Sequence, residues 1–563
     1  MKRQRQLDTI DKILVVAITA AVFLSLAFPL PEALASPGFS SYVLFEDPWF
    51  LASLLASLLM MGILWFRRGS DKVISLFVTV MFSIIVVDIW ELIAPGGDLL
   101  TSGANYAAVT NIVLESGRIP SVYWGGYPSI FLIASYLTSV MGLSLPRVLA
   151  LLDLLRSVLI GSLYFLIIAS LTKSRKSIAP ASMLSVIANE QLSKNGPFNV
   201  STYGLIFFLL AVLLITKASS LRGSVKAWPF VVTAIASVLT YPLTPFVILL
   251  IVGFSFIARE KVLSSRLFAV MGVSYAAWSV FGAVYVGPLQ TVWANIHSIL
   301  FGPNGLSGPG VSSAPTFYLT QLLDSNLKAL PYDLGYLLPS WFVFFFGFGT
   351  LAWVYMKSRH TKDSPPSFIV APLLITGFLL FLLPGGAEWV RILLYIAPFI
   401  GISLVLMLER LSSKVPMVLL GAVLLLTLPT IVAYYPVVGD YGAQYPWEYS
   451  AGNFIAGHTA TGYVYIGGGI LSLNYAMNAR IVPGLSNAPQ TSQGAQTIIE
   501  SQLQVYEHSK GGDFISISSI FYATYGHLYG DASADTIKTL LSSVDTTCLT
   551  YSNGFTRVST NSC

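Results

Sequence analysis

The chain carries little charge for its length. Of its 563 residues, 26 are acidic and 31 are Lys or Arg, so charged residues make up 10%, while 55% are hydrophobic. Mean hydropathy is +0.73, which excludes an ordinary soluble globular protein of this size. Many apolar windows of about 20 residues indicate a polytopic membrane protein, and they are helices because a backbone in lipid must satisfy its own hydrogen bonds.

Other signals are missing as well. Runs of Lys or Arg interleaved with aromatic residues are absent, so the net charge of +5 indicates loops that set topology and no nucleic-acid partner. The two cysteines belong to no CxxC or His/Cys cluster, and the chain has no Walker-type glycine loop and no internal repeat. A zinc site and a P-loop nucleotide site therefore have no support in the sequence.

The N-terminal segment is basic and then apolar. Lys2, Arg3 and Arg5 precede an apolar run over about residues 14–30, and ALAS at 33–36 offers a small-residue cleavage site. A cleaved signal peptide is one interpretation, but the length of the apolar run favours an uncleaved signal anchor. Both interpretations place the segment that follows outside.

Apolar windows predict about thirteen transmembrane helices. Clusters of Lys and Arg at their ends all fall on the side of the N-terminus, which makes the N-terminus cytoplasmic and the C-terminus extracytoplasmic. The windows cover roughly residues 14–30, 49–66, 73–94, 148–171, 178–190, 200–216, 228–241, 243–258, 267–286, 337–356, 368–383, 392–408 and 418–434.

One further apolar segment, residues 129–145, is treated differently. A span there would move the basic cluster at 173–176 to the outer side, against the charge rule. We therefore expect a helix that lies along the outer face of the membrane, in the same loop as Asp98.

This topology divides the chain into three regions. Residues 1–72 hold an additional N-terminal pair of spans. Residues 73–435 form a transmembrane core with large outer loops at 95–146 and 287–335. Residues 436–563 are rich in Gly, Ser, Thr and Tyr and contain alternating runs such as YVYIG and FISISS. They predict a small extracytoplasmic α/β or α+β domain on a polytopic α-helical membrane protein in a cell membrane.

Both cysteines lie in this tail. Cys548 and Cys563 flank Asn553 and Gly554, which form a strong signal for a two-residue hairpin. In an oxidising exterior the two thiols would form one disulfide, and two free thiols are the alternative. The disulfide is the favoured interpretation.

Acidic residues at the end of the 73–94 window supply the first candidates. Asp98 follows two glycines and precedes a short amphipathic helix that Gly117 closes. Its carboxylate would serve as a base or bind a divalent cation such as Mg²⁺ or Mn²⁺ on a phosphate, and a solvated loop acid is the alternative. Asp88 and Glu91 share one helix face, where an acid is costly unless it meets a cavity, a partner or the interface.

Arginines supply the second group of candidates. Arg391 begins a span just after Glu388, at the outer boundary, and a guanidinium there would hold a lipid-linked phosphate through bidentate bonds. Arg118 allows the same interpretation. The alternative for both is a side chain that snorkels to the membrane interface. On the predicted topology these residues, the Asp98 loop, the 287–335 loop and the tail share the outer side, as an active site open to the outside requires.

The order of these elements resembles the GT-C superfamily of membrane glycosyltransferases. The resemblance covers most of residues 73–563. The chain departs from the family pattern at LLTS, 99–102, where the family usually has a His or a second acid, in a longer spacing from Asp98 to Gly117, and in two additional spans before the core. The resembling stretches are PGGD at 95–98, IVLESGRIPS at 112–121, GGYPSIFLIASYLTSVMGL at 125–143, GAEWVRILLYIAPFIG at 386–401, EYSAGNFIAGH at 448–458 and YSNGFTRV at 551–558.

The resemblance implies transfer of a sugar from a polyprenyl-phosphate donor to a glycan, lipid or protein acceptor on the outer face. Asp98 would be the base at the acceptor hydroxyl, and Arg391 would stabilise the departing phosphate. Tyr123, Trp124 and Tyr127 would stack on sugar, and apolar grooves between spans would hold the prenyl chain of the membrane lipid.

Two other classes of function stay open. A transporter or flippase for lipid-linked glycans is disfavoured, because acids and prolines are scarce at mid-membrane and no inverted repeat is found. A non-catalytic membrane scaffold that displays the tail is the stronger competitor, because LLTS at 99–102 lacks the His or second acid that usually follows the acid in the family. The EDPWF at 46–50 resembles the first catalytic motif of oligosaccharyltransferases, but it runs straight into a span and the tail has no WWDYG-like element.

Overall fold

The structure is a computed structural model of residues 1–563, and it describes part of the chain. The described residues are 9–27, 48–87, 109–110, 113–114, 117–119, 127–143, 145–172, 175–193, 200–217, 224–258, 263–281, 349, 369–375, 395–396, 399–401, 403, 463–465, 480–481, 500, 504, 514–518, 539, 548–552 and 556–560.

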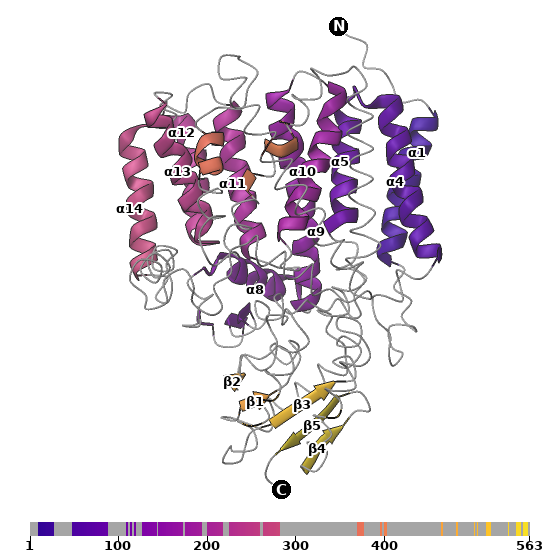
Figure 1. Ribbon diagram of the computed structural model, residues 1–563, viewed down its shortest axis with the longest axis vertical. Coiled ribbons are helices and arrows are strands. Elements are labelled where there is room, and N and C mark those ends of the chain that lie inside the picture. Colours follow the sequence, from indigo (N-terminus) through magenta and orange to yellow (C-terminus); the bar gives the residue numbers. More distant parts are fainter. Residues whose placement is uncertain are drawn as a thin grey trace.

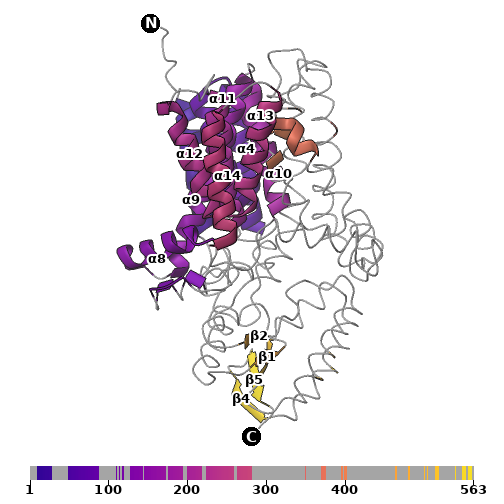
Figure 2. The same ribbon diagram turned by 90° about the vertical axis from the view of Figure 1, so that its left-hand side faces the viewer.

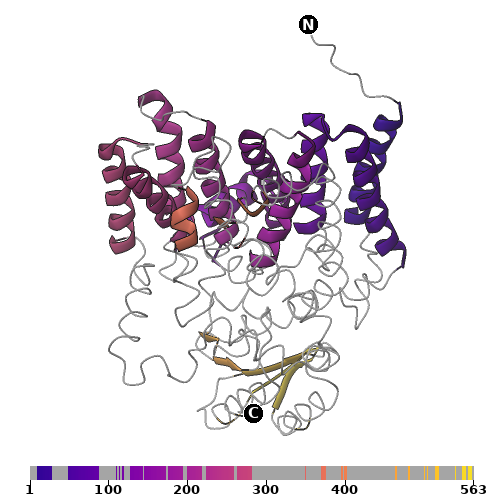
Figure 3. The same ribbon diagram turned by 45° about the horizontal axis from the view of Figure 1, so that its top comes forward.

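The described helices coincide with predicted apolar windows and pack side by side. Figure 1 shows them in a layer from α1 at one edge to α14 at the other, and the tilted view of Figure 3 shows the same two edges. The strands lie beyond one end of this layer. The helices of this layer are α1 (Thr9–Ala27), α4 (Pro48–Arg68), α5 (Lys72–Val87), α9 (Leu145–Leu171), α10 (Ile178–Ser193), α11 (Val200–Lys217), α12 (Ser224–Val238), α13 (Leu243–Ile257) and α14 (Ser265–Phe281).

The surfaces of these helices suit lipid. Within the described residues, Arg147–Leu171 is long and apolar enough to cross a membrane, and Val200–Thr216 is among five shorter apolar helices. Large apolar side chains such as Leu59, Phe66 and Trp228 are exposed on the bundle, where water would favour charge. Together with the composition, this shows a polytopic helical membrane protein. The number of spans stays a prediction, because most windows after residue 281 lie outside the described residues.

The contact between α5 and α9 depends on small residues. Ser83 of α5 donates a hydrogen bond from Oγ to the Ser157 carbonyl oxygen of α9 at 2.9 Å. A Cβ added to Gly161 would lie 2.9 Å from the Ser83 Cβ, so the two backbones approach closely only because this position is glycine. The last turn of α5, which leads toward Asp88 and Asp98, is therefore held firmly against α9.

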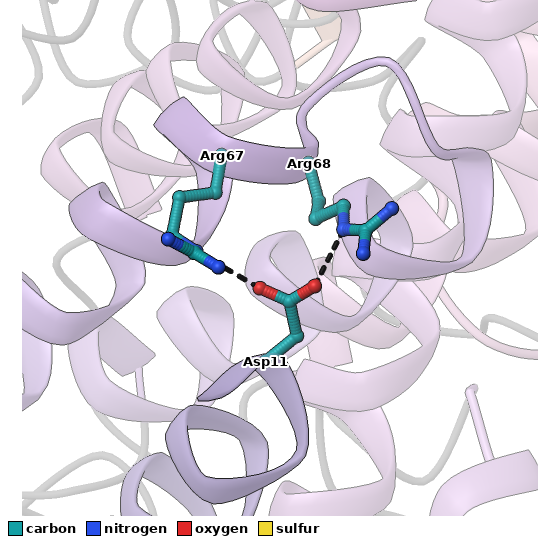
Figure 4. A network of polar contacts seen from close by, with 3 residues as sticks. All are labelled: Asp11, Arg67 and Arg68. Atoms are coloured by element: carbon teal, nitrogen blue, oxygen red, sulfur yellow. Dashed lines mark hydrogen bonds and ion pairs between the residues drawn. The ribbon is translucent and has the colours of Figure 1, made fainter. Parts of the chain in front are cut away.

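A buried carboxylate joins α1 to α4. Asp11 in the first turn of α1 is fully buried, and its Oδ1 accepts a hydrogen bond from Arg67 Nε at 3.0 Å. Its Oδ2 accepts a second one from Arg68 Nε, so both carboxylate oxygens face guanidinium groups (Figure 4). Ile18 and Val22 of α1 are also buried in the core. Helix α1 therefore packs on α4 through both polar and apolar contacts, and the uncleaved anchor stays a prediction.

We expect Asp11→Asn to destabilise the fold by about 2 kcal/mol, because an amide retains the volume but leaves two arginines without their counter-charge. The measurement is the thermal unfolding midpoint in detergent. Lys12→Gln is the matched control, since it removes one charge from the neighbouring, exposed position. A midpoint for Asp11→Asn equal to that of the control would show that the ion pairs contribute nothing to stability.

The described part of the tail contains a mixed five-stranded sheet. Its strands are β1 (Tyr463–Tyr465), β2 (Arg480–Ile481), β3 (Phe514–Ser518), β4 (Cys548–Ser552) and β5 (Thr556–Thr560), in the order β2-β1-β3-β5-β4. β1 pairs in parallel with β2 and β3, while β5 pairs antiparallel with β3 and β4. The alternating runs YVYIG and FISISS thus form β1 and β3 as predicted. The domain boundary at 436 stays a prediction.

The predicted hairpin is present, but its connection is longer than expected. The last pair of the β4–β5 ladder joins Ser552 to Arg557, so four residues lie between the last paired residues in place of two. The register also shifts between Leu549 and Tyr551, which is the mark of a β-bulge. Cys548 is the first residue of β4. Cys563 lies outside the described residues, so the disulfide stays a prediction.

Candidate active site at the α8 end of the bundle

Helix α8 (Ser129–Met141) lies apart from the layer of spans. Figure 1 places it at the end of the bundle that faces the strands, and Figure 2 shows it projecting to one side. We call this end of the bundle the α8 end. It includes the start of α9 and the link between α12 and α13 at residues 239–242. The helix occupies most of the segment predicted to lie along the outer face of the membrane, and its place relative to the membrane stays a prediction.

Helix α8 has two different faces. Ile130, Phe131, Ala134 and Ser135 are buried against the bundle, while the opposite face is exposed and has no charge. The exposed apolar side chains of α8 are Leu132, Ile133, Tyr136, Val140 and Met141. An apolar, uncharged outer face suits a helix that lies in the membrane interface.

Glycine ends α8 earlier than the sequence analysis predicted. The helix was expected to reach residue 145, but it stops at Met141. Gly142 has φ +64°, and its N–H donates to the Thr138 carbonyl oxygen at 3.1 Å. This left-handed conformation is a common helix end and strongly favours glycine. Helix α9 then begins at Leu145.

A second glycine closes the segment before α8, as predicted. Gly117 also has φ +64°, and its N–H donates to the Val113 carbonyl oxygen at 3.0 Å. Val113 is buried, and the Thr110 carbonyl oxygen accepts a hydrogen bond from Ser135 Oγ of α8 at 3.3 Å. The stretch that follows Asp98 in the chain is therefore docked on the buried face of α8.

The first residue of α8 is bound to the α12–α13 link. Ser129 donates its N–H to the Leu239 carbonyl oxygen at 3.2 Å. Its Oγ lies 2.7 Å from Thr240 Oγ1, within hydrogen-bonding distance. The aromatic turn at 123–127 immediately precedes this anchor, so its last residue is held near the link.

The same part of α13 holds a segment from much later in the chain. The hydroxyls of Thr244 and Tyr395 lie 2.9 Å apart, and the Tyr395 ring meets Phe208 of α11 edge to face at 4.8 Å. A Cβ on Gly401 would overlap the Ala181 carbonyl oxygen of α10. Tyr395 thus contacts α11 and α13, Gly401 packs on α10, and Tyr395 follows Arg391 by four residues in the chain.

A buried ion pair within α9 is hydrogen-bonded to the start of α11. Asp153 and Arg156 are each 2% exposed, with Arg156 Nη1 3.5 Å from Asp153 Oδ1. Tyr203 donates its hydroxyl to the same Asp153 oxygen at 3.0 Å, and Arg156 Nη1 donates to Thr202 Oγ1 at 3.3 Å. The sequence analysis missed this network. The sequence does contain a sign of the network: Asp153 and Arg156 carry opposite charges within an apolar window, and a spacing of three residues places both on one face of a helix.

The structure describes two of the predicted site residues. Tyr127 is only 2% exposed, so its ring is a packing residue at the entrance to α8 and offers no open face to a sugar. Arg118 is exposed just after Gly117. The other candidates lie outside the described residues: Asp88, Glu91, Asp98, Tyr123, Trp124, Glu388 and Arg391. Among the residues that the structure describes, no group of three or more His, Cys, Asp or Glu side chains could hold a metal ion.

Comparison with known proteins gives likenesses of structure only. No protein-family model and no curated protein matches the sequence. The chain is similar to ArnT from Cupriavidus metallidurans, solved with undecaprenyl phosphate, at 12% identity and a TM-score of 0.46, over 87% of this chain and 97% of that one. It is also similar to an oligosaccharyltransferase from Archaeoglobus fulgidus, solved with zinc and sulfate, at 15% identity and a TM-score of 0.46, over 82% of this chain and 70% of that one. With TM-scores below 0.5, these likenesses do not place the chain in a family.

Proposed function

We propose that the chain is a membrane glycosyltransferase of the GT-C type, which moves a sugar from a polyprenyl-phosphate donor to an acceptor at the outer face. One observation carries the proposal. Contacts at the start of α13 bring together two segments far apart in the chain, the one that begins α8 and the one that follows Arg391. Both segments belong to the elements that the sequence analysis assigned to one site.

The acceptor side of the proposed site lies before α8. Ser129 is fixed to Thr240, and Tyr123 and Trp124 precede it by only a few residues. Their rings would stack on a sugar, a role that buried Tyr127 does not fill. Arg118, exposed beyond Gly117, would meet charge on the substrate.

The donor side lies before Tyr395. Tyr395 is held to Thr244 at the first turn of α13. Arg391 is four residues earlier, which is about 6 Å away along a helix and at most about 14 Å away in any conformation. In the proposed site the arginine would lie at the same end of the bundle as α8. A guanidinium at that place, with Glu388 beside it in the chain, would bind the phosphate of a lipid donor whose prenyl chain lies between spans.

The acid would come from the end of α5. Val87 is the last residue of α5, and Asp88 follows it directly. In this reaction Asp98 would accept the proton of the acceptor hydroxyl while the acceptor oxygen attacks the anomeric carbon. The bond between the anomeric carbon and the phosphate oxygen breaks, the configuration of that carbon is inverted, and polyprenyl phosphate leaves. Arg391 would stabilise the negative charge on the departing phosphate. Asp98 with Asp88 or Glu91 would also supply the carboxylate oxygens that Mg²⁺ or Mn²⁺ prefers.

The test is donor cleavage by the purified protein in liposomes. A polyprenyl-phosphate-linked sugar with a label on the sugar is added, and free polyprenyl phosphate and labelled products are measured. We expect release of polyprenyl phosphate that depends on the protein and rises with an added hydroxyl acceptor. Movement of intact donor between leaflets without cleavage would identify a flippase. If no donor in a panel of different sugars is either cleaved or moved between leaflets, the protein would be a non-catalytic scaffold.

A further inference from the structure

Three consecutive residues at the start of α11 contact two different helices. Thr202 accepts a hydrogen bond from Arg156 of α9, and Tyr203 donates one to Asp153 of the same helix. Gly204 faces α13 instead, where an added Cβ would lie 2.5 Å from Thr244 Oγ1. The first turn of α11 is therefore the joint between α9 on one side and α13 on the other.

The α9 side of this joint uses directional bonds between buried groups. Asp153, Arg156, Thr202 and Tyr203 are all less than 9% exposed. Charges in such surroundings are costly unless they are paired and hydrogen-bonded. Apolar side chains would hold two helices together equally well, but they would allow rotation and sliding that hydrogen bonds with defined geometry oppose. The network thus sets the rotation and the axial position of α11 relative to α9.

The joint lies between the two halves of the proposed site. On one side, α9 is bound to α5 through Ser83 and Ser157, and α5 leads to Asp98. On the other side, α11 packs on α13, where Thr244 holds the segment that follows Arg391. A change at the joint would therefore shift α9 relative to α13, the two helices whose contacts lead to the two halves of the proposed site.

We infer that Asp153, Arg156 and Tyr203 are positioning residues that set the separation of Asp98 from Arg391. They contact no substrate, because they are enclosed between α9 and α11. The catalytic part of this inference rests on the proposed function. The mechanical part, that the network fixes α11 and through it α13, does not.

The principal test is Tyr203→Phe, which removes one hydroxyl and keeps the ion pair. We expect kcat to fall about tenfold while KM for the lipid donor stays within about twofold, since a displacement of about 1 Å at reacting groups impairs the chemical step more than binding. Tyr275→Phe is the matched control. That tyrosine is also buried, but it belongs to α14, at the edge of the helix layer (Figure 1).

A second variant tests the ion pair itself and does not depend on the Tyr203 hydroxyl. The double variant Asp153→Asn with Arg156→Gln removes both charges together and leaves no unpaired ion. We expect it to fold, because an amide pair of similar shape replaces the ions, and to lower kcat at least as much as Tyr203→Phe does. Wild-type kcat in this folded double variant would overturn the inference.

Hydrogen exchange separates the inference from the proposed function. We expect amides of residues 200–204, of 239–244 and of α8 to exchange faster in Tyr203→Phe and not in Tyr275→Phe. If Tyr203→Phe exchanges faster but the wild-type protein cleaves no donor, the mechanical part of the inference is supported and the proposed function is refuted. Faster exchange with unchanged kcat in an active protein would reduce the network to a structural role. Unchanged exchange would overturn the inference outright.

Discussion

Asp98→Asn is expected to abolish sugar transfer while the protein still folds. The change removes the base that accepts the proton of the acceptor hydroxyl, and a positioned base contributes roughly 10²–10⁴ in rate. It alters the volume of the side chain very little. The measurement is donor cleavage in liposomes, with the thermal unfolding midpoint as the test of folding. The expected result is loss of turnover at an unchanged midpoint.

The matched control lies at the opposite end of the helix that leads to Asp98. Asp71 precedes α5, where its Oδ1 accepts a hydrogen bond from the Val73 N–H at 2.9 Å. Asn caps a helix start about as well as Asp, so Asp71→Asn should leave both turnover and stability unchanged. If Asp98→Asn retained wild-type turnover, the base would have to be another acid, and Asp88 and Glu91 would be tested next.

Arg391→Lys is expected to lower transfer about tenfold, through weaker stabilisation of the departing phosphate. Lysine keeps the positive charge but replaces the planar fork of N–H donors by a single ammonium, so bidentate binding is lost. Arg391→Ala removes the charge as well and should cost more, in the range of about 10²–10³. The measurements are kcat and KM for the polyprenyl-phosphate-linked sugar.

Arg266→Lys serves as the control for the same chemical change. Arg266 is exposed in the first turn of α14, away from the α8 end. It should retain wild-type kcat and KM. Equal kinetics for Arg391→Lys and wild type would show that the arginine is an interfacial anchor, and the donor side of the proposed site would then need another cation.

A combination of variants tests whether the joint at α11 acts through the proposed reacting groups. Tyr203→Phe leaves Asp98 and Arg391 in place chemically, whereas the substitutions at those positions remove the reacting groups themselves. If the joint sets their separation, combining Tyr203→Phe with Arg391→Lys should give a loss smaller than the product of the separate losses, because coupled residues are not additive. A product of independent losses would indicate that the joint and the arginine act separately.

Hydropathy was sufficient to locate the described spans. α4, α9, α11 and α13 begin and end close to the predicted windows, because lipid requires each spanning segment to be apolar and helical along its own length. The position of α8 was also predicted, from the distribution of Lys and Arg. Gly117 was recognised as a helix end, but the equivalent role of Gly142 was missed, so α8 was predicted four residues too long.

The sequence by itself determined which segments are helices, that 129–141 lies apart from the spans, and that the tail contains strands, since each depends on local composition and periodicity. Only the tertiary structure decided which helices meet. Asp153 accepts a hydrogen bond from Tyr203, fifty residues later, and the hydroxyls of Thr244 and Tyr395 are hydrogen-bonded across a separation of 151 residues. No local pattern encodes such pairs, because they depend on how side chains from separate helices fill one space and satisfy each other's hydrogen bonds. The joint between α9, α11 and α13 could therefore be found only in the folded chain.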